Sequence, residues 1–498
     1  MNRRKKLYLN TVTALLSQGI AVICGFILPR YILLYFGSDS NGLVTSITRF
    51  LSVITFLELG VGPVIQSNLY KPLAENDQDT ISKMVVSAER FYKRIAYIFL
   101  GYIAVLAVVF PRITPEYDTG FTVSLLLIIS ISTFAQYYFG ITYQVFLNAD
   151  QKTYVHSTVQ IVTVILNTVI SVVLMKMGFG LHIVKLASAT VFVLRPIVQN
   201  LYVKKNYSIN RKIVYTEEPI KQKWNGFAQH LASVVCGEID VVLLTLFSSY
   251  KSVSIYSVYM LVVNGITTLI MTAVSGLEAF WGNMIARKEY KLLNKTFEAV
   301  EAVMHAGVTF LFVATAILIA PFIRVYTSGI EDSSAYYLPL FGALLTFAYG
   351  SQCLRVPYFR IIKAAGHYKE TQNGAFLSMG VNIVLSTIMV FKYQLIGVAI
   401  GTLGAMLYHT IYFAWYLRKN IINRPFRHFV KHIVVDIVVG ILAFIFTGWI
   451  NMSRNTYGTW IINAIIVAAI VGAISFILNF IIYQKEFIFL IKKILKKI

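Results

Sequence analysis

Long apolar runs fill most of this 498-residue chain, and the gaps between them are short and basic. A membrane-spanning helix needs about 20 mostly apolar residues, because a rise of about 1.5 Å per residue must cross about 30 Å of hydrocarbon. Fourteen runs satisfy this requirement, at approximately residues 8–35, 42–68, 91–110, 121–146, 155–177, 181–203, 226–248, 254–277, 298–325, 336–357, 372–391, 395–417, 432–450 and 459–483. They predict an all-α integral membrane protein with about 14 transmembrane helices.

Composition supports this fold class. Charged residues make up 13% of the chain and hydrophobic residues 57%, whereas a soluble protein keeps roughly 25% charged residues. A net charge of +22 would suggest nucleic-acid binding in a soluble protein. Here the basic residues occupy the gaps between apolar runs and no nucleic-acid motif is present, so we expect no nucleic-acid partner.

The basic residues also predict the orientation of the chain. With the N-terminus in the cytoplasm, 34 of the 44 Lys and Arg residues fall on the cytoplasmic side and 8 on the external side. This asymmetry follows the positive-inside rule, so we expect both termini in the cytoplasm. The basic start is followed by an apolar run that is too long for the core of a cleaved signal peptide. We therefore expect the first helix to be retained.

Two sequence motifs recur at nearly constant spacing. The segments 166–171 and 381–386 are similar and contain Asn167 and Asn382 at equivalent positions. Ala149 and Ala365, in a second pair of similar segments, are separated by almost the same length of chain. The repeat predicts two six-helix lobes in a pseudo-twofold parallel arrangement, followed by two extra helices. The predicted parts are an N-lobe over 1–210, a C-lobe over 211–425, two helices over 426–484 and a basic cytoplasmic tail over 485–498. The tail is expected to form an interfacial helix or to fray. Parallel repeats are typical of transporters, whose substrate site lies between the halves.

No enzyme motif is present. The chain lacks a nucleotide-binding loop, the H-E-x-x-H zinc motif and the G-x-S-x-G nucleophile motif. Its three cysteines all lie inside apolar runs, without metal-ligand spacing. We therefore expect no enzymatic activity, no cofactor and no resident metal, and any transport must draw on a gradient or a membrane potential.

Two arginines lie within the first two apolar runs. An ionisable group at bilayer depth costs roughly 2.5–3.5 kcal/mol on insertion scales, so it usually faces a cavity or a partner. Arg30 follows Pro29, which bends a helix, and Arg49 lies about eight residues inside its run. We predict that both line a polar cavity, although Arg30 could also extend its side chain to the outer surface.

The seventh run carries a stripe of polar residues. Gln229, Ser233 and Asp240 follow helical spacing and share one face, whereas Glu238 points away from it. We predict that these three residues bind substrate in the same cavity. We hypothesise that Arg30 or Arg49 pairs with Asp240 when the cavity faces inward.

Other charged residues have local explanations. Glu58 precedes Gly60, Gly62 and Pro63, which we expect to end the second helix, and its carboxylate could cap backbone donors there. Asp436 lies one turn after His432, which predicts local pairing. Finally, Arg355 and Arg360 flank Pro357 at the inner mouth of the tenth helix, where they could contact an anionic headgroup or serve only as positive-inside anchors.

Three segments carry a resemblance to a known family. They are Phe56-Leu57-Glu58-Leu59-Gly60-Val61-Gly62, Asn148-Ala149-Asp150-Gln151-Lys152-Thr153-Tyr154, and Ile239-Asp240 followed by Ile255-Tyr256-Ser257. With these segments the chain resembles the polysaccharide (Wzx-type) flippases of the multidrug/oligosaccharidyl-lipid/polysaccharide exporter superfamily.

The resemblance implies two six-helix lobes in a V shape, around a cavity lined by helices 1, 2, 7 and 8. It implies flipping of undecaprenyl-pyrophosphate-linked oligosaccharide repeat units to the outer leaflet by alternating access, for surface polysaccharide assembly. The implied location is the bacterial plasma (inner) membrane. The implied partners are the lipid-linked oligosaccharide, membrane lipids, a polysaccharide polymerase and other assembly proteins.

Alternative functions remain open at the level of the sequence. A flippase for the cell-wall lipid precursor would share the fold and the cationic cavity. A cation-coupled multidrug exporter of the same superfamily would need an acidic site, yet the only charge in the first apolar run is Arg30. A non-transporting membrane scaffold would make these charges structural. Coupling to protons or sodium through Asp240 is a further possibility.

Overall fold

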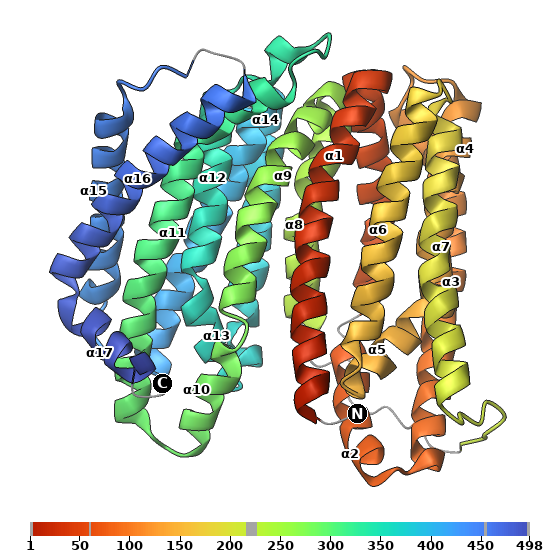
Figure 1. The fold of residues 1–498 in the computed structure, drawn as a ribbon, viewed down its shortest axis with the longest axis horizontal. Helices are drawn as coiled ribbons and strands as arrows, with labels where there is room; N and C mark the ends of the chain where they lie inside the picture. The colour runs from red at the N-terminus through yellow and green to blue at the C-terminus, as the bar shows by residue number, and fades with distance from the viewer. Residues whose placement is uncertain (1–2, 59–60, 216–226, 453–455, 496–498) are drawn as a thin grey trace. The chain divides into compact units, whose positions relative to one another are not determined.

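The computed structural model describes residues 3–58, 61–215, 227–452 and 456–495. Every regular element within these ranges is a helix (Figure 1). Ten helical runs among the described residues are long and apolar enough to cross a membrane. The structure therefore confirms an all-helical, multi-pass membrane protein.

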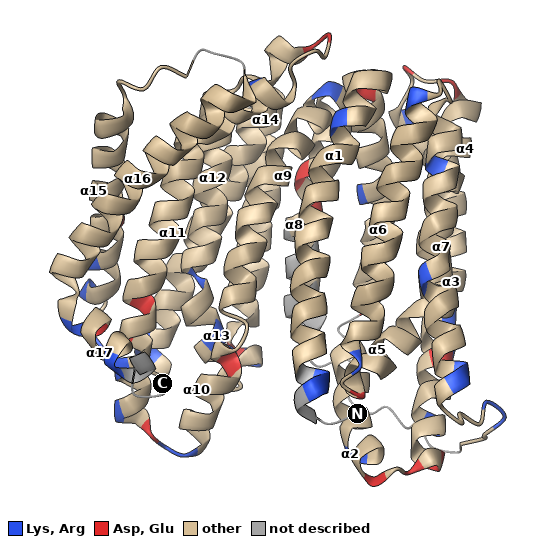
Figure 2. Cartoon of the chain, viewed as in Figure 1, with Lys and Arg blue, Asp and Glu red and all other residues tan. Residues whose placement is uncertain are grey.

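The chain divides into two compact units, Met1–Val234 and Val235–Ile498. The boundary falls inside α8 (Phe227–Phe247), so that this helix contributes Asp240 to the second unit. Figure 2 shows that charged residues gather toward the ends of the helices, while the middle parts are almost free of them. This distribution matches the low-dielectric interior expected of a membrane protein.

The first unit contains two very different kinds of helix, long spans and short segments at their ends. Its elements are α1 (Arg3–Ser52), the 3₁₀ turn η1 (Val53–Glu58), α2 (Val61–Glu75), α3 (Gln78–Ile113), α4 (Thr119–Ala135), the π-helical turn η2 (Gln136–Gly140), α5 (Ile141–Ala149), α6 (Thr153–Lys176) and α7 (Leu181–Asn206).

The 50-residue helix α1 is interrupted at Gly37, where φ is 78° and ψ is 176°. A straight helix of that length would extend about 75 Å, far more than the roughly 30 Å of a bilayer core. Gly37 adopts this left-handed φ readily because it has no Cβ. The first two predicted spans therefore meet at one residue instead of being separated by the expected gap over 36–41.

The second predicted span, over 42–68, is interrupted, because α1 ends at Ser52, η1 ends at Glu58 and a new helix begins before Pro63. Helix α2 begins at Val61, includes Pro63 in its first turn and continues to Glu75. A proline is tolerated there because the N–H groups of a first helical turn have no intrahelical acceptor. Pro63 thus lies in the first turn of the new helix α2.

The second unit has more elements and a more deeply buried centre. After α8 come α9 (Tyr250–Ala273), α10 (Leu277–Ala286), α11 (Tyr290–Tyr326), the 3₁₀ turn η3 (Ser333–Tyr336), α12 (Pro339–Leu354), α13 (Val356–Ala364), α14 (Tyr368–Asn420), α15 (Arg427–Thr447), α16 (Tyr457–Ile482) and α17 (Gln484–Leu495). Helix α11 is central, because it contacts α12, α15, α16 and α17. The basic tail thus forms a helix, α17, that packs against α11.

Helix α14 is two antiparallel spans joined at Gln394, where φ is 47° and ψ is −119°. Ser378 Oγ donates to Ala405 O at 3.1 Å, and Ser386 Oγ donates to Val398 O at 3.4 Å. The first pair of residues is 27 positions apart in the chain and the second, which is nearer Gln394, is 12 positions apart. Contacts of this kind define a helical hairpin. The predicted boundary between the eleventh and twelfth spans, residues 391–395, is confirmed at this turn.

The turns of the two units recur at the spacing that the sequence motif predicts. Three residues with left-handed backbone between helices of the first unit each have a counterpart in the second unit at a nearly constant separation along the chain. The pairs are Asn76 and Lys288, Gln151 and Gly366, and Gly178 and Gln394. Equivalent turns at nearly equal spacing support a duplicated helical plan within the chain.

Candidate functional site

Asp240 is buried in the second unit and contacts two hydroxyl groups. Its side chain lies on α8 and is 1% exposed. The Tyr256 hydroxyl on α9 donates to Asp240 Oδ2 at 2.8 Å, and the Thr402 hydroxyl on α14 donates to the same oxygen at 2.7 Å. Both donors are neutral, so within the described residues the carboxylate has hydrogen bonds but no counter-charge.

Thr402 connects Asp240 to a polar stripe on the first half of α14. Asn382 Nδ2 donates to Thr402 Oγ1 at 3.2 Å, and Ser386 lies one turn further along the same helix. Asp240 Oδ1 and Asn382 Oδ1 are both buried without a hydrogen-bond partner among the described residues. A buried oxygen left unpaired costs about 1–3 kcal/mol, so each of these two atoms needs a donor or a cation.

Glycines on the second half of α14 make this arrangement possible. A Cβ added to Gly401 would lie 2.1 Å from Ser386 Oγ and 2.5 Å from Ser386 N. Only a glycine therefore allows the two halves of the hairpin to approach so closely at this level. The close approach brings Asn382 against Thr402 and, through Thr402, against Asp240.

The chemistry of this cluster fits a monovalent hard cation. Its groups are the Asp240 carboxylate, the Thr402 hydroxyl and the Asn382 amide, which contact one another in that order, and, one turn along α14, the Ser386 hydroxyl, which donates to the Val398 carbonyl. Such all-oxygen sets suit hard cations, and a single formal negative charge matches Na⁺ better than a divalent ion. Within the described residues no group of three or more His, Cys, Asp and Glu side chains could hold a metal. A proton on the Asp240 carboxylate is the other species that this environment can hold.

The predicted cavity arginines belong to the first unit. Arg30 and Arg49 are both half-buried in α1 and both engage other groups. Arg30 precedes Gly37 by about two turns of helix and Arg49 follows it by more than three, which corresponds to about 10 Å and about 18 Å along the two spans. Arg49 is therefore deeper than the predicted boundary at residue 42 implied. The hypothesised pairing with Asp240 stays a prediction.

The remaining predicted site residues are placed as follows. Gln229 and Ser233 are in α8, but their side chains lie outside the described residues. Arg355 ends α12, with Nη1 3.8 Å from Met406 Sδ. Arg360 Nη1 lies 2.9 Å from Glu278 Oε2. Contact of these two arginines with a headgroup stays a prediction, and for Arg360 it would compete with the Glu278 ion pair.

The structure corrects one local expectation, for Asp436, whereas capping of backbone donors by Glu58 stays a prediction. Glu58 Oε1 accepts a hydrogen bond of 2.5 Å from the Tyr137 hydroxyl, so the carboxylate links η1 to η2 across 79 residues. Asp436 does not pair with His432. Its carboxylate lies 2.6 Å from His305 Nδ1 and accepts from Thr309 at 2.7 Å, because the side of α15 that carries it packs on α11.

Comparisons with known proteins identify the fold. No protein-family model and no curated protein matches the sequence. An inward-facing multidrug resistance MATE family transporter of the MOP superfamily matches with a TM-score of 0.57 at 14% identity, over 83% of this chain and 96% of that chain.

Two further solved structures agree. A Vibrio cholerae MATE transporter in the bent form gives a TM-score of 0.54 at 15% identity, over 83% of this chain and 96% of that chain. A eukaryotic MATE transporter gives 0.54 at 13% identity, over 83% and 95%. The protein therefore has the fold of MATE-type transporters, and at this identity the likeness establishes the fold alone.

Proposed function

We propose that this protein is an alternating-access transporter, not an enzyme, that flips undecaprenyl-pyrophosphate-linked oligosaccharide repeat units to the outer leaflet of the bacterial plasma membrane. The observation that carries the proposal is the cationic character of α1. Arg30 and Arg49 are half-buried at membrane depth, while the only acidic residue of α1 is Asp39, close to the Gly37 kink. A pair of arginines at this depth suits an anionic headgroup.

The chemistry of the substrate explains why such residues are needed. Arginine binds phosphate oxygens through paired N–H donors, which gives strong and directional contacts. Each glycan hydroxyl costs roughly 2–7 kcal/mol to bury without a hydrogen bond, so the sugar needs a polar passage. An inside-negative potential favours outward movement of an anion by about 2.3 kcal/mol per charge per 100 mV. The pyrophosphate would therefore assist its own export.

The helix inventory supports the proposed topology. Ten runs qualify as spans, two of them contain a second span beyond Gly37 or Gln394, and the shorter or more polar helices α8 and α12 complete a set of 14. An even number places both termini on one side of the membrane. The positive-inside rule assigns that side to the cytoplasm.

Cation coupling through the Asp240 cluster would supply a further driving force. A cation bound by the two unpaired oxygens of Asp240 and Asn382 would hold α8 against α14. Its release would return the carboxylate to hydrogen bonds with Tyr256 and Thr402 alone. A binding equilibrium at a contact between helices is the physical basis for coupling an ion to a conformational change.

Multidrug export is the second candidate, because the solved structures with this fold include multidrug resistance transporters. A cationic drug would need a carboxylate in the passage. The acidic residues of the first two spans are Asp39, at the kink, and Glu58, which accepts from Tyr137. Arg30 and Arg49 in these spans favour an anionic substrate, either a polysaccharide repeat unit or a cell-wall lipid precursor, whereas the buried Asp240 carboxylate on α8 is the group that a cationic drug would use.

The test measures lipid-linked oligosaccharide at the outer surface of sealed spheroplasts after deletion of the gene. Complementation uses the wild-type chain, Arg49→Gln, and the exposed control Arg112→Gln at the end of α3. We expect the repeat unit to remain on the inner leaflet in the deletion strain and in R49Q, and to reach the surface with wild type and R112Q. The trapped glycan identifies the substrate. Normal surface exposure in the deletion strain together with new sensitivity to cationic drugs would instead establish drug export.

A further inference from the structure

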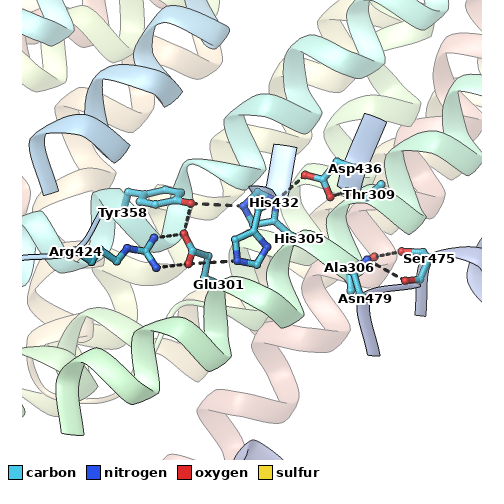
Figure 3. Close-up of polar contacts among 10 residues, drawn as sticks. All are labelled: Glu301, His305, Ala306, Thr309, Tyr358, Arg424, His432, Asp436, Ser475 and Asn479. Atoms are coloured by element: carbon cyan, nitrogen blue, oxygen red, sulfur yellow. Dashed lines mark hydrogen bonds and ion pairs between the residues drawn. The ribbon is translucent and has the colours of Figure 1, made fainter. Parts of the chain in front are cut away.

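A second buried polar cluster lies in the second unit, away from Asp240. Figure 3 shows its members meeting between α11, α13 and α15. Two ion pairs form its centre, Glu301 with Arg424 and His305 with Asp436. Tyr358 and His432 contact them. The function proposed above does not use them.

The first ion pair is electrically complete. Arg424 Nη1 donates to Glu301 Oε2 at 2.6 Å, and Nη2 donates to Oε1 of the same carboxylate. The Tyr358 hydroxyl also donates to Glu301 Oε1. Because a hydroxyl carries a single proton, Tyr358 can offer only its lone pairs to any other neighbour.

This limitation fixes the protonation of His305. Its Nδ1 lies 2.6 Å from Asp436 Oδ2, and its Nε2 lies 3.5 Å from the Tyr358 oxygen. An ionised carboxylate accepts only, and the Tyr358 oxygen accepts in this direction, so both ring nitrogens face acceptors. The pattern is satisfied by an imidazolium that donates on both sides, which also balances the charge of Asp436.

His432 cannot hold a second proton of the same kind. Its Nε2 lies 3.5 Å from Glu301 Oε2 and its Nδ1 is buried without a partner among the described residues, which fits a neutral ring. His432 stacks on His305 with ring centroids 4.5 Å apart, and Tyr483 stacks on its other face at 4.1 Å. Two imidazolium rings at that separation would repel each other, so the stack holds one cation.

We propose that His305 and Asp436 form a proton-binding site that takes one proton and fastens α15 to α11 and α13. With the proton bound, the two ion pairs are neutral together. Without it, the cluster holds two carboxylates against one arginine, and His305 Nε2 and the Tyr358 oxygen confront each other with lone pairs. Loss of the proton therefore weakens contacts that cross from α11 to both neighbours.

The surroundings of the pair contain few competing charges. Asp436 is 12% exposed, whereas the His305 side chain is 1% exposed, so the carboxylate is the more accessible of the two groups. Helix α16 contributes the neutral side chains of Ser475, which donates to Ala306 O at 2.8 Å, and Asn479. The charged groups at the rim of the cluster are Glu298, His428, Lys431 and Glu486, on α11, α15 and α17.

Nitrogen-15 NMR of the full chain in lipid nanodiscs, labelled at its eight histidines, tests the site directly. Imidazole shifts distinguish a doubly protonated ring from either neutral tautomer. We expect one imidazolium signal to persist at pH 7.5, where an ordinary histidine is largely neutral because its pKa is about 6.5. The signal should be absent from His305→Gln and present in His182→Gln, a control in the first unit whose ring bonds Ser124.

Asp436→Asn provides a second test, because it keeps His305 and the shape of its partner but removes the anion. We expect the imidazolium signal at pH 7.5 to disappear in this variant. Thermal stability of wild type should fall as the pH rises above the ordinary histidine pKa of about 6.5, and this dependence should be lost in the variant. An imidazolium signal that survives in either D436N or H305Q would overturn the proposal. A wild-type spectrum that contains only neutral histidines at pH 7.5 would overturn it as well.

Discussion

Thr402 Oγ1 lies 2.7 Å from Asp240 Oδ2, although the two residues are 162 positions apart in the chain. The contact joins α8 to the second half of α14, and the buried carboxylate of Asp240 thus lies beside the hydroxyls of Tyr256 and Thr402. This relationship turns an isolated acidic residue into part of an oxygen cluster suited to a cation.

Replacing Thr402 by valine should impair cation binding. The substitution removes the donor to Asp240 and the acceptor for Asn382 without a large change in volume. We expect the apparent affinity for Na⁺ to fall at least tenfold, or about 1.4 kcal/mol. The measurement is the rise in melting temperature of the purified protein with NaCl, compared with choline chloride.

Thr346→Val is the matched control for that experiment, because Thr346 is also buried but donates to Gly342 O of its own helix at 2.6 Å. It should leave the response to Na⁺ unchanged. If wild type shows no difference between the two salts, the cluster does not bind sodium.

Replacing Gly401 by alanine should destabilise the α14 hairpin. The new methyl group would lie 2.1 Å from Ser386 Oγ and 2.5 Å from a backbone nitrogen, so the two halves must separate. Such overpacking costs about 1–3 kcal/mol. The free energy of unfolding in mild detergent measures it.

Gly380→Ala is the matched control on the same hairpin, because nothing lies within 4 Å of a Cβ added there. This variant should be neutral or stabilised by up to about 1 kcal/mol, since alanine is the better helix former. Equal losses of stability in G380A and G401A would show that the close approach at Gly401 has no special role.

Breaking the Glu301–Arg424 ion pair should be costly. Glu301→Gln leaves a buried guanidinium without its counter-charge, and removing one partner of a buried pair costs about 3–5 kcal/mol. The double variant E301Q/R424Q should recover part of this loss, because no unpaired charge remains. A double-mutant cycle on the unfolding free energy measures the coupling, and strictly additive losses would contradict it.

Asp150 predicts an acid-sensitive contribution to stability. It lies between α5 and α6, where burial raises the pKa of its carboxyl but hydrogen bonds from Tyr207 and Lys152, with Lys152 Nζ at 2.9 Å, outweigh burial and lower the pKa overall. A carboxyl whose pKa is lowered on folding stabilises the protein above its unfolded pKa of about 3.9 and loses that effect as the pH falls through the folded value.

The melting temperature of wild type should therefore decrease below about pH 4, near the ordinary pKa of an aspartate. Asp150→Asn should show a smaller decrease because it has no carboxyl to protonate, whereas Asp79→Asn, at an exposed position in the first turn of α3, should follow wild type. Identical acid profiles for all three proteins would refute this account.

The sequence predicted the membrane-spanning character well because apolar runs are a local property. The break between the first two spans was placed correctly within residues 36–41, which contain Gly37, but only the backbone shows that the turn is confined to that one residue. The second span was predicted too long, over 42–68, because a proline such as Pro63 fits the first turn of a new helix as well as the end of an old one. The hairpin at Gln394 was found because its flanking runs each have the length of one span.

The candidate sites depend on contacts that no local pattern encodes. Asp240 was singled out as an acidic residue in an apolar run, but its partners Tyr256 and Thr402 lie on other helices. Asn382 and Ser386 were noticed only as a repeat of an earlier motif. Glu301 and His305 were missed, although two ionisable residues one turn apart in the ninth run were a usable signal.

The recurring motif has a further consequence. Asn167 in the first unit is the counterpart of Asn382. Ser171 Oγ donates to Asn167 Oδ1 at 3.4 Å, so this amide oxygen already has a hydrogen-bond partner. Counting back from Thr402 by the spacing that separates the two asparagines reaches Ala187, whose side chain offers no oxygen. Among the described residues, the second copy of the duplicated plan thus retains side chains that suit an ion and the first does not. Dissolved sodium should then protect one half of the molecule against heat and leave the other half indifferent, so that a single melting transition would separate into two as the salt concentration rises.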